Sequence, residues 1–223
     1  MQFKVASVDS LIIYFGNEIN EQIALQVKLA YDNIKDGQGL IDVVPSYTSI
    51  LVVYDIFTHS YDALCEILTQ QITSSKIATS VNSKLIQIGV YYGLEVGLDL
   101  PTMSEQHSLS VDEIVKIHTS QTYLVYAIGF APGFAYLGSV SNAIATPRLA
   151  TPRKLVQKGS VAIADTQTAI YPEDSPGGWN IVGKSTFNAY NKTLPTLTPF
   201  AVGDKIQFVP ISKKEFLQEG GVL

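Results

Sequence analysis

The sequence predicts an α+β protein of two domains, a small N-terminal ββαββα domain followed by a β-barrel domain. Two observations favour this fold class. Residues 1–73 alternate strand-like runs with two amphipathic helical patterns, whereas the rest of the chain carries short strand-like runs separated by glycine and proline. The 223 residues, 46% hydrophobic and 16% charged, supply enough apolar material for buried cores without a metal or a disulfide.

The N-terminal domain is predicted from its periodicities. Runs rich in β-branched residues indicate strands, and apolar residues that recur at spacings of three and four indicate helices. Gly37 and Gly39 end the first helix, because glycine is disfavoured in a helix interior. The expected elements are strands over 3–7 and 11–15, a helix over 18–35, strands over 41–44 and 49–54, and a helix over 61–73.

Each predicted helix carries one apolar stripe, which we expect to face the sheet. The stripe of the first helix consists of Ile19, Ile23, Val27, Ala30 and Ile34, and that of the second consists of Leu64, Ile67 and Leu68.

The polar stretch TSSKIATSVNSK separates the two halves of the chain. Its apolar residues follow neither the spacing of a helix nor the alternation of a strand. Linkers between domains are commonly polar, and few core contacts cross them. We therefore place the domain boundary between Thr73 and Lys84, with residues 1–78 in the N-terminal domain and residues 79–223 in the barrel domain.

The second domain opens with a strand over 86–92 and continues with a short helix that ends near His118. Ser110, followed three residues later by Glu113, forms the capping box that begins this helix. Short strands with turn signals then indicate a closed barrel, which removes exposed sheet edges. These strands are expected over 123–128, 161–164, 169–171, 179–182 and 206–209.

Composition narrows the cellular context. Cys65 is the single cysteine and lies in a helical pattern, so we expect its side chain to be a small buried apolar group. A chain that cannot form an internal disulfide fits a reducing compartment. The chain shows no secretory leader and no apolar run near the roughly 18 residues that a membrane span needs. The net charge is −5 with scattered basic residues. We expect a cytoplasmic protein that binds neither nucleic acid nor membrane.

Residues 129–185 carry most of the chemical information, because they join aromatic groups to sharp bends. Pro132-Gly133 and Pro176-Gly177-Gly178 predict bends, since proline fixes φ and glycine accepts positive φ. Each bend sets aromatic side chains at a defined angle.

The phrase Ala-Thr-Pro-Arg occurs twice in this segment and ends at Arg148 and at Arg153. Both arginines follow residues that disfavour helix, so we expect them on extended, loop-like backbone. A planar guanidinium group there meets a carboxylate or a phosphate. Structural ion pairing is the equally weighted alternative, because guanidinium groups serve both roles.

Residues 178–185 match the phosphate-loop pattern G-x4-G-K-S. That mechanism requires a strand before the loop and a helix after it. Here a Ser-Pro-Gly turn precedes the pattern, its interior Trp-Asn-Ile-Val reads as a strand, and the following residues do not read as a helix. We interpret the match as chance and expect Lys184 to act at most as a solitary charge toward an anion.

No catalytic residue is assigned from the sequence. His118 closes a helix, where a histidine commonly serves the helix dipole or packing. The histidines lack metal-ligand spacing, and no acidic cluster accompanies them, so no metal site is predicted. No G-x-S-x-G elbow of a serine hydrolase is present. Glu173 and Asp174 precede a Ser-Pro turn and are expected to stabilise it.

The phrases GF-x-PGF-x-YLG, TPR-x3-PR, GSVAIA and QT-x-IYP-x-x-SPGGW-x-IVGKS resemble those of the family of B-type 5-oxoprolinase subunits. This family is also known as allophanate hydrolase subunit 1 and as the Kip-type sporulation kinase inhibitor. The resemblance runs over nearly the whole chain and includes ASVDSLIIYFGNEIN, VVPSYTSILVVYD, IQIGVYYGLEVGLDL and VGDKIQFVPI in the family's order. It implies that the barrel is cyclophilin-like and related to carboxyltransferase subdomains C and D.

The resemblance implies a subunit of an ATP-dependent 5-oxoprolinase that opens 5-oxo-L-proline to L-glutamate. Its partners would be the A-type and C-type subunits, and ATP would be used by the complex rather than bound by this chain alone. Two alternatives remain open: a carboxyltransferase or allophanate hydrolase-type subunit of urea metabolism, and a non-catalytic inhibitor of a histidine kinase.

We expect the substrate, 5-oxoproline or a related small amide, to meet residues of the central motifs. For the aromatic members the competing interpretation is barrel core, because large apolar rings are usually buried. The expected substrate-binding residues are Phe134, Tyr136, Arg148, Arg153, Gln167, Tyr171, Gly177, Gly178 and Trp179.

Overall fold

The computed structural model describes residues 1–74 and 83–223. Contacts within the chain divide it into two compact units, Met1–Ser83 and Lys84–Leu223. The boundary expected from the sequence, between residues 78 and 79, lies outside the described residues.

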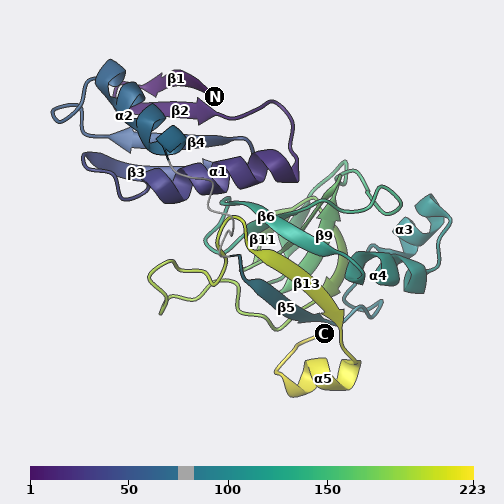
Figure 1. The fold of residues 1–223 in the computed structure, drawn as a ribbon. Helices are drawn as coiled ribbons and strands as arrows, with labels where there is room; N and C mark the ends of the chain where they lie inside the picture. The colour runs from purple at the N-terminus through teal and green to yellow at the C-terminus, as the bar shows by residue number, and fades with distance from the viewer. Residues whose placement is uncertain (75–82) are drawn as a thin grey trace. The chain divides into compact units, whose positions relative to one another are not determined.

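The N-terminal unit is a four-stranded antiparallel sheet with two helices (Figure 1). Strand order is β1-β2-β4-β3, and both helices pack on the face that carries Leu11, Ile13, Ile50 and Val52. The ββαββα order predicted from the sequence is confirmed. The elements are β1 (Gln2–Ser7), β2 (Ser10–Tyr14), α1 (Glu21–Ile34), β3 (Leu40–Ser46), β4 (Ser49–Tyr54) and α2 (Tyr61–Ser74).

Helix α1 begins three residues later than the periodicity predicts. The side chain of Asn20 accepts a hydrogen bond of 2.9 Å from the amide of Ile23, which caps the helix. Ile19 therefore precedes the helix and is 52% exposed. Ile67 in α2 is also exposed, at 36%, whereas Leu64 and Leu68 are buried as predicted.

The second unit holds a seven-stranded sheet in the order β12-β9-β10-β7-β6-β13-β5 and a separate two-stranded sheet of β8 and β11. Helix α4 begins with the predicted capping box of Ser110 and Glu113. The elements are β5 (Leu85–Val90), α3 (Leu100–His107), α4 (Val111–Thr119), β6 (Thr122–Ile128), β7 (Ala135–Gly138), β8 (Arg153–Val156), β9 (Ser160–Ala164), β10 (Gln167–Ile170), β11 (Ser175–Gly177), β12 (Asn180–Lys184), β13 (Lys205–Pro210) and α5 (Lys213–Gln218).

The two outer strands of the large sheet, β5 and β12, meet and nearly close it into a barrel. Tyr91, next to β5, and Lys184 of β12 exchange two backbone hydrogen bonds of 2.8 Å each. The hydroxyl of Ser185 donates to the carbonyl of Gly89 at 2.6 Å. These contacts satisfy backbone groups that would otherwise form exposed edges, and they confirm the predicted barrel.

The barrel strands have two apolar faces. Side chains alternate between faces along a strand, and in β9 the larger residues Val161 and Ile163 face the barrel interior. Ala162 and Ala164 face the opposite side, where they join an outer-face cluster with Ala169 of β10. Small residues on that side leave room for aromatic rings.

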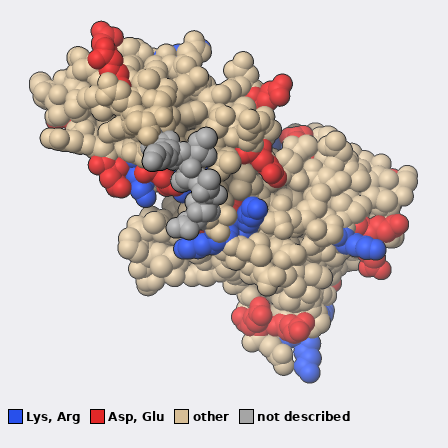
Figure 2. Space-filling model, in the orientation of Figure 1, with Lys and Arg blue, Asp and Glu red and all other residues tan. Residues whose placement is uncertain are grey.

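No helix among residues 1–74 and 83–223 is long and apolar enough to cross a membrane. On the face shown in Figure 2, lysine and arginine side chains lie in separate small groups among acidic ones.

Limited proteolysis should first cut the chain between about residues 73 and 85, because polar linkers are cleaved before packed elements. The fragment that begins near Leu85 should keep a cooperative thermal transition and a near-UV signal from Trp179, since the closed barrel has its own apolar interior. Mass spectrometry and circular dichroism of the fragments check this. An unfolded C-terminal fragment would show that the two units share one core.

Candidate functional site

The outer face of the barrel carries an aromatic cluster of four rings, Phe134, Tyr136, Tyr171 and Trp179. The ring of Phe134 is central, with centroid distances of 4.9 Å to Tyr136, 5.4 Å to Tyr171 and 5.6 Å to Trp179. The last two contacts are edge-to-face, at 85° and 90°, which is a favourable ring geometry. Phe134, Tyr171 and Trp179 are buried, so they form a packed wall, and Tyr136 is half-buried.

Glycine at position 177 is required by the Tyr171 hydroxyl. A Cβ atom at Gly177 would lie 2.2 Å from that oxygen. Gly177 belongs to β11, and neither it nor Gly178 has positive φ, so the prediction that these glycines serve a positive-φ bend is wrong. Gly133 does have positive φ, at 84°, as predicted.

Arg148 lies over the aromatic cluster. Its guanidinium carbon is 5.7 Å from the centroid of the Trp179 ring, a cation–π distance, and the residue is exposed. Two hydrogen bonds fix the backbone on either side of Arg148. Asn180 donates to the carbonyl of Pro147 at 2.9 Å, and the amide of Leu149 donates to the carbonyl of Gly178 at 2.7 Å.

Arg153, the first residue of β8, is held by a buried carboxylate. Its Nη2 donates to Oδ1 of Asp99 at 2.7 Å, and Oδ2 of Asp99 accepts the amide of Ile181 at 2.6 Å. Asp99 is 7% exposed. The other terminal nitrogen of Arg153, Nη1, is buried and has no hydrogen-bond partner among the described residues. One half of this guanidinium group is thus structural, and the other half has no acceptor among the described residues.

Both arginines act on the same hydroxyl group. Burial raises the pKa of Tyr171, while the backbone amide of Trp179 and the positive charges of Arg148 and Arg153 lower it. Arg148 therefore brings a positive charge to a site lined by aromatic rings, while Asp99 balances the charge of Arg153. Such a site suits an anion whose remaining surface is flat or apolar.

Gln167 is placed on the same side of the sheet. It begins β10 and is half-buried, and strand alternation puts it on the face of Ala169. The structure therefore places Phe134, Tyr136, Arg148, Tyr171, Gly177 and Trp179 in contact with one another, whereas Gln167 lies on the same face at the end of β10 away from Tyr171. No ligand contact tests these assignments.

Three residues of the site were absent from the prediction. Phe130 is 67% exposed with φ of 70°, an uncommon backbone for a bulky residue, and its ring lies 5.3 Å from Phe134. Phe130 lies in the motif GF-x-PGF, so the sequence carried a signal for it. Asp99 and Asn180 had no local signal, because their partners are far along the chain.

The phosphate-loop match does not form a phosphate loop. Residues 180–184 are strand β12, and no helix follows within residues 185–190. The amine of Lys184 donates to Oε1 of Gln157 at 2.5 Å. The sequence-based rejection of this motif is confirmed.

His118 is a core residue with both ring nitrogens bonded. Nδ1 lies 2.8 Å from the Tyr92 hydroxyl, and Nε2 lies 3.0 Å from the Thr168 hydroxyl. Because Thr168 donates to the carbonyl of Ala162, its oxygen accepts from Nε2. Burial lowers the pKa of His118 to about 3, so the ring is neutral and serves packing rather than the helix dipole.

Asp174 and Glu173, which precede β11, bind Lys158 in the turn between β8 and β9. Oδ1 of Asp174 accepts the backbone amide of Lys158 at 2.7 Å, and Glu173 pairs with the Lys158 amine at 2.9 Å.

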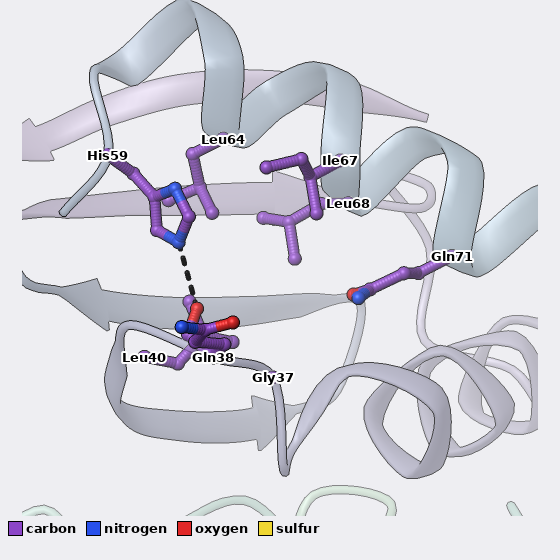
Figure 3. Close-up of a pocket in the computed structure, with 8 residues that line it drawn as sticks. All are labelled: Gly37, Gln38, Leu40, His59, Leu64, Ile67, Leu68 and Gln71. Carbon is purple, nitrogen blue, oxygen red and sulfur yellow. Dashed lines mark hydrogen bonds between the residues drawn. The ribbon is translucent and has the colours of Figure 1, made fainter.

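A pocket of about 190 Å³ in the N-terminal unit is structural in character (Figure 3). A ring nitrogen of His59 lies 2.9 Å from the carbonyl of Gln38 and fixes the turn between α1 and β3. The remaining wall is largely apolar, with Leu40, Leu64 and Leu68.

The nearly closed barrel preceded by a ββαββα unit has the fold of a carboxyltransferase-type domain. The family described as carboxyltransferase domain, subdomain C and D, matches residues 1–200. The B-type 5-oxoprolinase subunit of Bacillus subtilis is 34% identical over 93% of this chain and 91% of its own length. The chain belongs to the family of B-type 5-oxoprolinase subunits.

Solved structures share this fold. TTHA0988 is 30% identical with a TM-score of 0.81, over 92% of this chain and 40% of that protein, so the chain spans less than half of TTHA0988. The conserved uncharacterized protein PH0987 of Pyrococcus horikoshii is 39% identical, with a TM-score of 0.58 over 96% of this chain and all of that protein. Kluyveromyces lactis urea amidolyase, at 15% identity and a TM-score of 0.75, shows the fold alone.

Proposed function

We propose that this chain is a subunit of an ATP-dependent 5-oxoprolinase complex that opens 5-oxo-L-proline to L-glutamate, and that it is inactive alone. The observation that carries the proposal is Arg148 over the aromatic cluster together with Arg153, whose Nη1 is buried and unpaired among the described residues. The name of the Bacillus subtilis relative supports the choice of reaction.

The substrate matches this site in charge and shape. 5-Oxoproline carries one carboxylate on a small flat lactam ring, so its anion would meet the positive charges of Arg148 and Arg153. The rings of Tyr136 and Phe130 would cover the lactam and exclude water.

The chemistry requires partners. A lactam is a resonance-stabilised amide, and the side chains gathered here offer positive charge and aromatic surface rather than an acid and a base. The A-type and C-type subunits would supply the rest of the site. Residues 180–184 form strand β12 rather than a phosphate loop, and in this proposal a partner binds ATP.

The two alternative functions predict different neighbouring genes. A carboxyltransferase-type subunit of urea metabolism should be encoded beside a biotin carboxylase, whereas a 5-oxoprolinase subunit should be encoded beside the two other subunits. A kinase inhibitor would bind a histidine kinase without either neighbour, and it would need only a surface.

The purified chain alone should not turn over 5-oxoproline with ATP, because it lacks an assigned acid and base. Adding the A-type and C-type subunits should restore glutamate production, measured by a coupled glutamate assay. Substantial turnover by the isolated chain would contradict the proposal, and so would an inactive complete mixture of folded subunits.

In the assembled complex, Arg148→Ala and Arg153→Ala should each lower activity at least about tenfold, on the order of 1.4 kcal/mol for a lost charge-assisted contact. Arg153→Lys can still pair with Asp99 but loses the guanidinium fork, so its loss of activity separates ligand binding from stability. Steady-state kinetics with 5-oxoproline as the varied substrate measure both effects.

Two lysines serve as controls for this series. Lys154→Ala changes an exposed neighbour on β8 and should leave activity unchanged. Lys184→Ala should leave the ATP affinity of the complex nearly unchanged. If Lys184→Ala abolishes nucleotide binding while both arginine variants stay active, the sites have been assigned to the wrong motifs.

A further inference from the structure

A pocket in the barrel unit, of about 290 Å³, holds a lysine behind apolar walls. Its polar lining consists of Glu95, Gln157, Ser160 and Lys184, and its apolar lining includes Val96, Leu98, Leu155 and Leu223. Leu98 and Leu155 are 53% and 57% exposed, so the apolar lining continues to the molecular surface. We call this the Lys184 pocket.

Lys184 is nine-tenths buried, with 9% of its surface exposed. Its amine donates to Oε1 of Gln157 and forms no ion pair with any carboxylate of the described residues. Burial lowers the pKa of Lys184, and the more distant charge of Asp174 raises it. A buried ammonium group with one neutral acceptor is incompletely compensated.

The acidic group at the rim does not compensate it. Glu95 pairs with Lys213 at 2.7 Å and accepts from the Tyr91 hydroxyl at 2.9 Å. The bond from Lys213 is the largest cause that lowers the pKa of Glu95 to about 2, so its carboxylate is ionised and already engaged. The positive charge inside the pocket therefore remains open to an external anion.

The lining decides what kind of anion fits. One ammonium group matches one negative charge, whereas a phosphate dianion is usually met by several charged donors or a guanidinium fork. The apolar walls favour a ligand whose remaining part is aliphatic. We propose that the Lys184 pocket is a second ligand site of this protein, separate from the arginine site, and that it binds a small aliphatic monocarboxylate.

The two sites share a wall. Val156 and Ile181 line the Lys184 pocket and also pack in the outer-face cluster with Trp179. A ligand that presses on this wall changes the surroundings of the single tryptophan. Trp179 fluorescence therefore reports occupancy of the pocket.

The test uses the full chain at pH 7 and constant ionic strength, titrated separately with acetate, butyrate, hexanoate and inorganic phosphate. Affinity from calorimetry and from Trp179 fluorescence should rise with chain length, by at most about fourfold per methylene group. Inorganic phosphate should bind more weakly than butyrate. Equal affinities for acetate and hexanoate, or tighter binding of phosphate, would overturn the proposed ligand class.

Variants locate the binding. Lys184→Met should weaken butyrate binding at least about tenfold. Leu155→Glu should do the same from an exposed position, where the fold does not depend on the side chain. Lys158→Met, an exposed lysine close in sequence, and Arg148→Ala should bind butyrate normally. Unchanged binding by both Lys184→Met and Leu155→Glu would refute the site, and loss in Arg148→Ala would move it to the arginine site.

Discussion

Replacing Asp99 by alanine should lower the free energy of unfolding of the barrel unit by about 3 kcal/mol. The change leaves the charge of Arg153 without its partner and the buried amide of Ile181 without an acceptor. Removing one member of a buried pair is costly, because the remaining charge cannot return to water. Urea unfolding followed by Trp179 fluorescence measures the loss, since this reporter lies in the same unit.

A matched pair on the surface gives the control. Lys158 and Glu173 lie 2.9 Å apart, similar to the Arg153–Asp99 distance, but their side chains are 48% and 52% exposed. Glu173→Ala should therefore cost less than about 1 kcal/mol. If Asp99→Ala and Glu173→Ala cost the same, burial does not strengthen the Arg153–Asp99 contact. The double variant Asp99→Ala, Arg153→Ala should be more stable than additivity predicts.

The ion pair of Asp99 and Arg153 connects the stability of the barrel unit to the proposed function. Asp99 engages Nη2 of Arg153 and leaves Nη1 directed to an acceptor that the described residues do not provide. A flexible arginine would have to order its side chain on binding, at a cost of roughly 1 kcal/mol or more. Asp99 is thus a positioning residue, and Asp99→Asn should raise KM more than it lowers kcat.

Periodicity and capping chemistry account for most of the fold that the sequence predicted. The ββαββα order followed from local patterns, because each strand and helix there has one face on its own small core. The same reasoning could have found α5, since Ser212 and Glu215 repeat the capping box that identified α4. That signal was present and was overlooked.

The strands β8 and β11 could not be predicted in this way. They are four and three residues long, and each is a strand only because it pairs with the other, although β9 and β10 lie between them in the sequence. Arg153 and Asp99 are 54 residues apart, so no local pattern links them. Contacts of this kind depend on how the barrel closes, which is a property of the whole unit.

The aromatic residues show why a site is harder to predict than a fold. The sequence left Trp179 and Phe134 undecided between core and site rim. They are 5% and 2% exposed, which is typical of core, yet Arg148 lies over the Trp179 ring on the outer side of the sheet. A packed wall behind an exposed guanidinium group satisfies both interpretations, and burial alone could not decide between them.

Acid should destabilise the barrel unit through His118. In the folded state burial lowers the pKa of His118 from 6.5 to about 3, while in the unfolded chain the ring keeps its usual pKa. Between these values the unfolded state binds more protons, so the free energy of unfolding falls as the pH is lowered. One histidine contributes a slope of up to about 1.4 kcal/mol per pH unit in this window.

The groups packed around His118 do not stabilise a positive charge on its ring. The hydroxyls of Tyr92 and Tyr123 stay neutral, because burial raises the pKa of each. Phe208 stacks on the imidazole at 4.8 Å, and Tyr123 donates to the backbone carbonyl of His118 at 2.7 Å. A charge on this ring would therefore be desolvated without a counter-ion, which makes protonation and unfolding competing outcomes.

The test compares the free energy of unfolding of the native chain and of His118→Gln from pH 7 to pH 4, followed by Trp179 fluorescence. Glutamine can replace both hydrogen bonds but loses the ring contact with Phe208, so the variant should be less stable at pH 7. Because glutamine does not titrate, the variant should lose stability more slowly toward acid. Phe208→Leu is the control, because it weakens the same core and keeps the histidine. Its curve should run parallel to that of the native chain. Parallel curves for His118→Gln as well would show that His118 is not the group that titrates.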